Sequence, residues 1–285
     1  MVGATYPVGP FRIADADVTV TCNDIDFADV GAWSFQDLAA PRHDQATTTH
    51  EFEVRRTERP WVHWGIWRDG EPCETVLDEG YVLFHLQWEF NRIALERQFA
   101  TIHAAAARND AGAALLCGAS MSGKTTLAGW LATTGWTFLA DEIVEIDDQG
   151  GLHGYLRPLG IRHGGPLSPL YAMPAELDRR FEEYESLVPV SVLPNASVGS
   201  ASAPLRLIVF PRYTPGAPTR TTQLVPSEIL TELCDASPGL GRHGLGVFQI
   251  LTRTARSVPG IRVEYSNLDD VAGELTLWMS RGCHG

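Results

Sequence analysis

The most informative part of this sequence is a stretch of fifteen residues, Ala113-Ala-Leu-Leu-Cys-Gly-Ala-Ser-Met-Ser-Gly-Lys-Thr-Thr-Leu127. Its first part, Ala113 to Cys117, is apolar or small and predicts a short strand. The next eight residues, Gly118 to Thr125, match the pattern GxxxxGK[ST] in full. Residues Lys124 to Thr134 predict a helix, and Gly135 is a typical residue to end it. A strand, a glycine-bounded loop and a helix in this order form the context in which the pattern binds phosphate groups.

The residues of this loop suit a nucleotide triphosphate with its magnesium ion. Glycines let backbone N–H groups turn inward around phosphate oxygens, and the helix N-terminus adds its positive end. The Lys124 ammonium would reach the β- and γ-phosphates, and the Thr125 hydroxyl would bind Mg²⁺. Lys124 is the only lysine among 22 basic residues, at the one position where the bulkier arginine does not substitute. We therefore expect ATP to be held by Gly118, Ala119, Ser120, Met121, Ser122, Gly123, Lys124, Thr125 and Thr126.

Two further places carry candidate catalytic groups. Asp141 and Glu142 end the next predicted strand, Thr137 to Asp141, at the edge where α/β sheets place ligands. A carboxylate there is a candidate base for a substrate hydroxyl or a candidate Mg²⁺ ligand, although such pairs are often solvated turns or caps. His103 lies fifteen residues before the loop, and its spacing alone favours a core histidine.

Four segments in order resemble the catalytic domain of HPr kinase/phosphorylase and its related kinases. They are Ile102-His103, the loop, Leu139-Ala-Asp-Glu-Ile-Val-Glu-Ile146 and Arg157-Pro-Leu-Gly-Ile161. The resemblance covers roughly residues 80 to 275. It implies an α/β P-loop kinase domain of the HPr kinase/phosphoenolpyruvate carboxykinase-like type, with a mixed sheet and flanking helices.

The resemblance also implies roles for single residues. His103, Lys124 and Asp141 match catalytic positions, with Asp141 as the acceptor of the substrate proton, and Thr125 matches the metal-binding hydroxyl. Glu142 stands where the family has a second aspartate and can still bind metal.

The sequence also departs from the family pattern in three places. Tyr155 stands where the family has a metal-binding glutamate, and Pro158 replaces a glycine. Gly241-Arg242 is only faintly similar to a functional Gly-Arg pair, so we do not expect the reverse phosphorylase reaction.

The rest of the chain gives a coarse organisation. Residues 1–97 predict a β-rich N-terminal segment, with Val62, Trp64 and Ile66 on one face of a strand, and residues 98–285 the kinase domain. Further predicted elements are helices over Tyr81 to Phe99, Pro174 to Ser186, Pro226 to Cys234 and Leu268 to Met279, strands over Ile143 to Ile146, Leu152 to Leu156 and Leu205 to Phe210, and a loop over Val188 to Pro204.

Composition limits the partners. The 22 basic and 35 acidic residues give a net charge of −13, which argues against nucleic acid. The five cysteines lack the spacing of a zinc site or a disulfide framework, and no signal or membrane segment is recognisable, so we expect a cytoplasmic protein. HPr kinases form oligomers, so the resemblance suggests a homo-oligomer.

The expected function is Mg²⁺-assisted transfer of phosphate from ATP to a serine or threonine hydroxyl of a protein or peptide, such as the precursor of a ribosomally made peptide. Two alternatives stay open. One is a small-molecule kinase on the same fold, because fold does not fix substrate. The other is a nucleotide-binding regulator without turnover, which the absence of a glutamate at position 155 keeps open.

Overall fold

The computed structural model describes residues 4–39, 48–58, 60–96, 99–181, 185–199, 202–238 and 240–281. The protein is mixed α/β and divides into two compact units, residues 1–96 with 157–192 and residues 97–156 with 193–285. The predicted boundary between residues 97 and 98 lies outside the described residues. Residues 157–192, which the sequence assigned to the kinase domain, group with the N-terminal residues instead.

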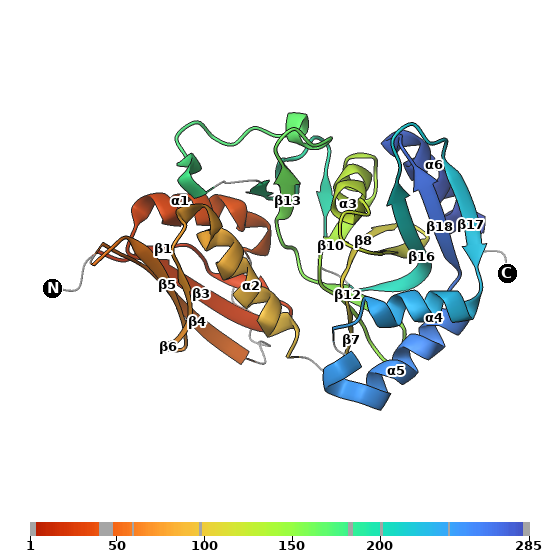
Figure 1. The fold of residues 1–285 in the computed structure, drawn as a ribbon, viewed down its shortest axis with the longest axis horizontal. Coiled ribbons are helices and arrows are strands. Elements are labelled where there is room, and N and C mark those ends of the chain that lie inside the picture. The colour runs from red at the N-terminus through yellow and green to blue at the C-terminus, as the bar shows by residue number, and fades with distance from the viewer. Residues whose placement is uncertain are drawn as a thin grey trace. The chain divides into compact units, whose positions relative to one another are not determined.

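The first unit contains a six-stranded sheet in the order β1-β3-β4-β5-β6, with β2 also paired to β3 (Figure 1). Only β3 and β4 are parallel among these pairs. Trp64 and Ile66 lie on one face of β5, as predicted, and both are fully buried. Val62, which was predicted to share that face, precedes the strand and is 39% exposed. The strands are β1 Tyr6–Pro7, β2 Phe11–Ile13, β3 Ala16–Cys22, β4 Thr48–Thr57, β5 His63–Arg68 and β6 Glu71–Val76.

Two helices supply much of the core of this unit. The α1 helix, Ile25–Ser34, begins after Asp24, whose Oδ1 accepts a hydrogen bond from the Phe27 N–H at 3.0 Å. The α2 helix, Val82–Ala94, was predicted to run from Tyr81 to Phe99 but ends five residues earlier. Its buried face joins an aromatic cluster with edge-to-face contacts, made of Phe11, Phe35, Phe52 and Phe90.

The helix predicted within residues 157–192 is absent from the described part of this segment. The sequence predicted a surface helix over Pro174 to Ser186, but Arg179–Phe181 is one short 3₁₀ turn and Glu185–Val188 is strand β14. Strand β14 pairs antiparallel with β13, Leu159–Arg162. The helical prediction was wrong because Phe181 is buried edge-on against Phe27 and Trp64, a packing constraint that local propensity does not encode.

The predicted loop over Val188 to Pro204 was only partly right. It contains a 3₁₀ turn, Val190–Val192, and a two-residue strand, β15 Ser197–Val198. Residues 200 and 201 lie outside the described part of the chain.

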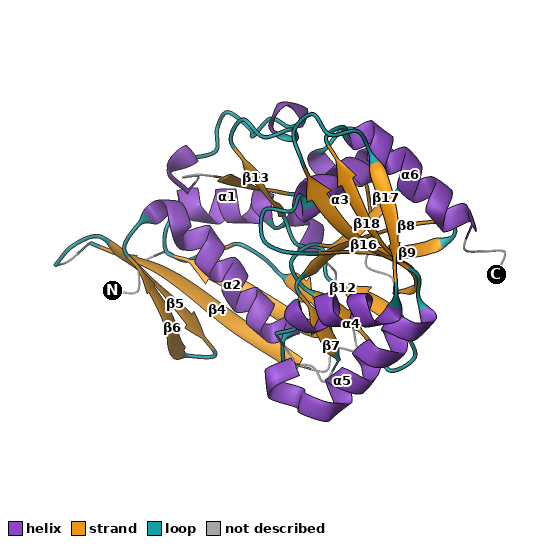
Figure 2. Ribbon diagram, turned by 45° about the vertical axis from the view of Figure 1, so that its right-hand side comes forward, coloured by secondary structure: helices purple, strands orange, loops and turns teal. Residues whose placement is uncertain are grey.

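The second unit contains ten strands of the described residues in one mixed sheet (Figure 2). Strand β9, which leads into the glycine loop, lies between antiparallel β8 and parallel β16. Strand β10 pairs with β8, and β18 pairs with β16, so β9 is central. The strands are β7 Ala100–Ile102, β8 Ala104–Asn109, β9 Gly112–Cys117, β10 Thr137–Ala140, β11 Val144–Ile146, β12 Gly151–Gly154, β15 Ser197–Val198, β16 Ala203–Tyr213, β17 Arg220–Leu224 and β18 Gly260–Tyr265.

Among the described residues, four helices flank this sheet. Helices α3 Lys124–Thr133, α4 Pro226–Asp235 and α6 Leu268–Arg281 agree with prediction within two residues. The sequence did not predict α5, Leu240–Ser257, which is kinked at Gly244 with φ 55° and ψ −125°. It packs beside α4. Among the described residues, no helix is both long and apolar enough to span a membrane.

Candidate functional site

The glycine loop joins the end of β9 to the start of α3, as the sequence predicted. Three of its residues have positive φ: Gly118 at 152°, Met121 at 69° and Gly123 at 99°. Glycine adopts such angles readily, whereas Met121 does so at a cost. The chain therefore turns back toward the helix N-terminus, where the first N–H groups have no acceptor within the helix. This geometry suits a bound anion.

Gly123 has a second reason to be glycine. A Cβ atom built on it would lie 2.5 Å from the Tyr265 hydroxyl oxygen. Tyr265 ends strand β18 and is only 1% exposed, and burial raises the pKa of its phenol to about 12. The tyrosine therefore fills the space below the loop and cannot easily move.

We expect Gly123→Ala to destabilise the protein more than Gly135→Ala does. Both glycines have nearly the same φ, 99° and 95°, but a Cβ on Gly135 meets nothing within 4 Å. The positive φ alone costs about 1–2 kcal/mol in either variant, and the collision with Tyr265 adds about 1–3 kcal/mol. Thermal unfolding of the two variants measures the difference, and equal losses would show that Tyr265 yields to the added methyl group.

Lys124 is held by the loop itself. Its Nζ donates hydrogen bonds to the carbonyl oxygens of Gly118 at 2.8 Å and Ala119 at 3.0 Å. The residue is only 7% exposed. Burial lowers the pKa of its ammonium group below the usual 10.5, while the negative charges of Asp141 and Glu142 act in the opposite direction. A bound triphosphate would add negative charge and so favour the charged form.

The lowered pKa can be measured directly because Lys124 is the only lysine. We expect competitive acetylation of Lys124 to reach half its maximal rate at a pH below 10.5, since the neutral amine is the nucleophile and burial disfavours the ammonium form. Mass spectrometry of the modified peptide follows the reaction, with a free lysine peptide in the same tube as reference. A midpoint at or above that of the reference would contradict the assigned effect of burial.

Thr125 and Asp141 meet in space. The Thr125 Oγ1 donates a hydrogen bond to Asp141 Oδ2 at 2.9 Å. Thr125 lies in the first turn of α3, and Asp141 directly follows β10 and is 2% exposed. The structure thus brings the predicted metal-binding hydroxyl and the predicted catalytic carboxylate into contact.

Glu142 and His103 lie on neighbouring connections between strands: Glu142 between β10 and β11, and His103 between β7 and β8. Glu142 has a φ of 63°, and its carbonyl oxygen accepts a hydrogen bond from the Ala104 N–H at 3.3 Å. The neighbouring His103 lies between β7 and β8 and is half-buried. Its backbone N–H donates a hydrogen bond to the Ala236 carbonyl oxygen at 2.7 Å. The hydrogen bond from Ala104 therefore places the backbone of His103 next to the segment of Asp141 and Glu142.

The loop residues fit the phosphates of a nucleotide. Among the residues that the structure describes, Ser122 Oγ is a buried hydroxyl without a hydrogen-bond partner. It faces Gly118, where a Cβ would lie 3.2 Å away. A hydroxyl, a lysine ammonium and free helix N–H groups around one turn are donors for phosphate oxygens.

The residues also fit magnesium. In the described part of the chain, no three His, Cys, Asp or Glu side chains gather as a metal site of their own. Mg²⁺ takes one or two carboxylates together with phosphate oxygens and waters, so a full protein cage is not required. Thr125, Asp141 and Glu142 supply the hard oxygen atoms that it prefers.

Two other features bear on the candidate site. Tyr155, which follows β12 directly, is 4% exposed and offers no carboxylate. Residues Arg157 to Ile161, the fourth segment of the resemblance, belong to the first unit, unlike the other three.

The sequence missed Tyr213 and Tyr265, which border the loop. Tyr213 ends β16, and its N–H donates to the Ser122 carbonyl oxygen at 3.3 Å. The predicted strand Leu205 to Phe210 stopped short of it, and β18 was not predicted at all. A tyrosine at the end of each strand was the only available signal.

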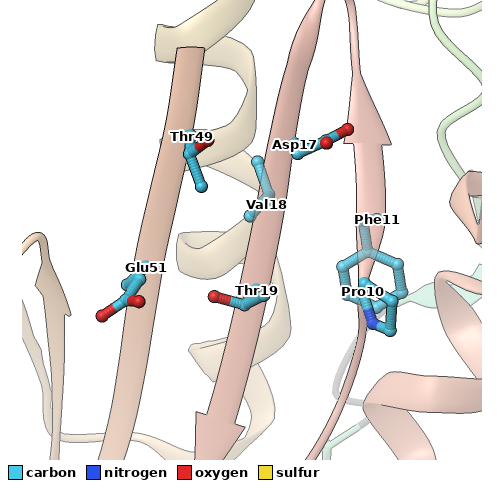
Figure 3. A pocket seen from close by; sticks show the side chains of 7 residues that line it. All are labelled: Pro10, Phe11, Asp17, Val18, Thr19, Thr49 and Glu51. Atoms are coloured by element: carbon cyan, nitrogen blue, oxygen red, sulfur yellow. The ribbon is translucent and has the colours of Figure 1, made fainter. Parts of the chain in front are cut away.

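A separate pocket of about 250 Å³ lies in the first unit. Its lining residues come from β2, β3 and β4 and from Pro10, which precedes β2 (Figure 3). None of the predicted site residues lines it. The lining residues are Pro10, Phe11, Asp17, Val18, Thr19, Thr49 and Glu51.

No family model and no curated protein sequence matches the chain. Among solved structures, the chain is similar to the Hpr(Ser) kinase/phosphatase from Coxiella burnetii, with a TM-score of 0.29 and 12% sequence identity. The match covers 64% of this chain and 94% of that chain. At this TM-score the similarity supports no inference about function, which depends on the residues of the site.

Proposed function

We propose that the protein transfers the terminal phosphate of ATP, with the help of Mg²⁺, to a serine or threonine hydroxyl of a protein or peptide. The observation that carries the proposal is the 2.9 Å hydrogen bond from Thr125 Oγ1 to Asp141 Oδ2 beside a complete glycine loop. It joins a phosphate-binding element to a carboxylate that lies 16 residues further along the chain.

In this proposal the loop binds and orients the triphosphate. The Lys124 ammonium leaves the carbonyl oxygens of Gly118 and Ala119 for phosphate oxygens, and the Ser122 hydroxyl donates to one more. Mg²⁺, when bound by Thr125 and Glu142, supplies positive charge that stabilises the phosphoryl group during transfer. Most of the rate enhancement then comes from positioning and electrostatics.

Asp141 has the proton-transfer role. Its carboxylate accepts the proton of the substrate hydroxyl as that oxygen approaches the terminal phosphate. His103, on the neighbouring strand end, helps to position the reacting groups. Such a role requires Asp141 to be ionised and within hydrogen-bond reach of the acceptor.

The class of the phosphate acceptor is inferred from the charge of the protein. Net charge disfavours nucleic acid as the partner, and we propose a protein or peptide substrate in the cytoplasm, with self-association of the kinase. The small-molecule kinase and the regulator without turnover are distinct outcomes of the same experiment.

The test incubates the purified protein and Mg²⁺ with γ-labelled ATP and size-fractionated lysate from its own source. Lys124→Ala serves as the inactive comparison, and Asp148→Asn, an exposed aspartate six residues after Glu142, as the matched control. We expect label in a protein or peptide fraction with wild type and Asp148→Asn but not with Lys124→Ala. Label only in small molecules would favour the small-molecule kinase, and ATP binding without any transfer would favour the regulator.

A further inference from the structure

The two sides of the glycine loop differ in chemistry. Strand β9 leads into the loop, with β8 and β10 on one side and β16 and β18 on the other. Asp141 and Glu142 follow β10, whereas Tyr213 and Tyr265 end β16 and β18. One side therefore carries carboxylates and the other aromatic rings.

The Tyr213 ring is held in place and yet accessible. It is 50% exposed, whereas Tyr265 below it is 1% exposed. The two rings meet edge-to-face, with centroids 5.9 Å apart and planes at 71°. The residue after Tyr213 is fixed to the end of β18, because the Thr214 N–H donates to the Tyr265 carbonyl oxygen at 2.9 Å and Thr214 Oγ1 donates to Glu264 Oε1 at 2.8 Å.

The backbone of Tyr213 also contacts the loop directly, through the hydrogen bond from its N–H to the Ser122 carbonyl oxygen at 3.3 Å. Because the ring is half exposed, only part of its apolar surface is buried in the protein. Its face is a stacking surface for a planar ring of a ligand.

The geometry points to Tyr213 as the residue that stacks against the nucleobase of the nucleotide. This inference depends on the proposed function, since it assumes that the loop binds the phosphates. The terminal phosphate must face Asp141, where transfer occurs, so the nucleoside leads away from the carboxylates toward the side of β16. On that side, Tyr213 is an exposed aromatic residue whose backbone contacts the loop.

The experiment compares a ligand that has a base with one that lacks it. Binding of ATP and of inorganic tripolyphosphate, both with Mg²⁺, is measured by calorimetry for wild type, Tyr213→Ala and Tyr213→Phe. Phe248→Ala is the matched control, because Phe248 is an exposed aromatic residue on α5 of the same unit, 41% exposed. The N–H of residue 213 remains in every variant, so the hydrogen bond to Ser122 is kept.

We expect Tyr213→Ala to raise the Kd for ATP on the order of 10-fold, as loss of one aromatic–base stack does. Tripolyphosphate affinity stays at the wild-type level, Tyr213→Phe restores the lost ATP affinity, and Phe248→Ala binds ATP like wild type. Equal ATP affinity of Tyr213→Ala and wild type would overturn the assignment, and so would an equal loss for ATP and tripolyphosphate, which would mean a distorted loop.

Failure of the proposed function has a different signature. If wild type bound neither ligand, or if Lys124→Ala left both affinities unchanged, the loop would not be a phosphate site. If wild type bound both ligands and Lys124→Ala weakened both, the phosphate site would stand whatever the result at Tyr213.

Discussion

Replacing Asp141 with asparagine is expected to lower phosphoryl transfer by about two to four orders of magnitude while ATP stays bound. Asparagine has nearly the same shape, and its Oδ1 can still accept the Thr125 hydroxyl that Asp141 Oδ2 accepts at 2.9 Å. Its amide, however, cannot take the proton of a substrate hydroxyl. Single-turnover transfer from γ-labelled ATP to the acceptor fraction measures the rate, and calorimetry measures ATP binding in parallel.

Two controls decide whether Asp141 acts as a base or as a metal ligand. Asp148→Asn makes the same chemical change at an exposed position in the same unit and should transfer at the wild-type rate. A Mg²⁺ titration of Asp141→Asn should not restore activity if the lost function is proton acceptance. Recovery of activity at high Mg²⁺ would indicate that Asp141 is a metal ligand. If Asp141→Asn keeps more than about a tenth of the wild-type rate, Asp141 is not the base.

Replacing Lys124 with alanine is expected to raise the Kd for ATP by about 10- to 150-fold, the range of about 1.5–3 kcal/mol for a hydrogen bond to a charged group. Transfer should fall further, by about two to three orders of magnitude, because the ammonium also stabilises charge in the transition state. Lys124→Arg keeps the charge but not the shape and should not rescue activity. Near-normal ATP affinity in Lys124→Ala would contradict a phosphate role for this lysine.

The same residue offers a test without substitution. Because no other lysine exists in the chain, acetylation of an ε-amino group reports on Lys124 alone. ATP with Mg²⁺ should slow this acetylation, since phosphate oxygens favour the unreactive ammonium form and cover it. Adenosine, which lacks phosphates, is the control and should leave the rate unchanged. Equal rates with and without ATP would place the phosphates elsewhere.

Much of the second unit was predictable from local sequence. The ends of β9 agree with prediction within one residue, and so does α3, whose start at Lys124 is the predicted one. An apolar run, glycines with positive φ and a helix that follows them are all encoded within about 25 consecutive residues. These patterns can be recognised without the rest of the chain, and they also predicted Lys124 and Thr125 as site residues.

Prediction failed for one segment whose conformation distant residues decide and for one helix whose local signal is weak. Phe181 lies in a 3₁₀ turn and not in the predicted helix, because it packs against Phe27 and Trp64, more than a hundred residues earlier. The α5 helix has a kink at Gly244 and a glycine-rich start, so its pattern was weak as a helix signal.

Local sequence was enough to predict a strand, a phosphate-type loop and a helix in this order, with candidate carboxylates after the next strand. Three features became visible only in the folded protein: the contact between Asp141 and Thr125, the position of Tyr265 under Gly123, and the grouping of residues 157–192 with the N-terminal residues. The reason is that periodicity and backbone preference act over a few residues, whereas strand order and packing join segments far apart in the chain.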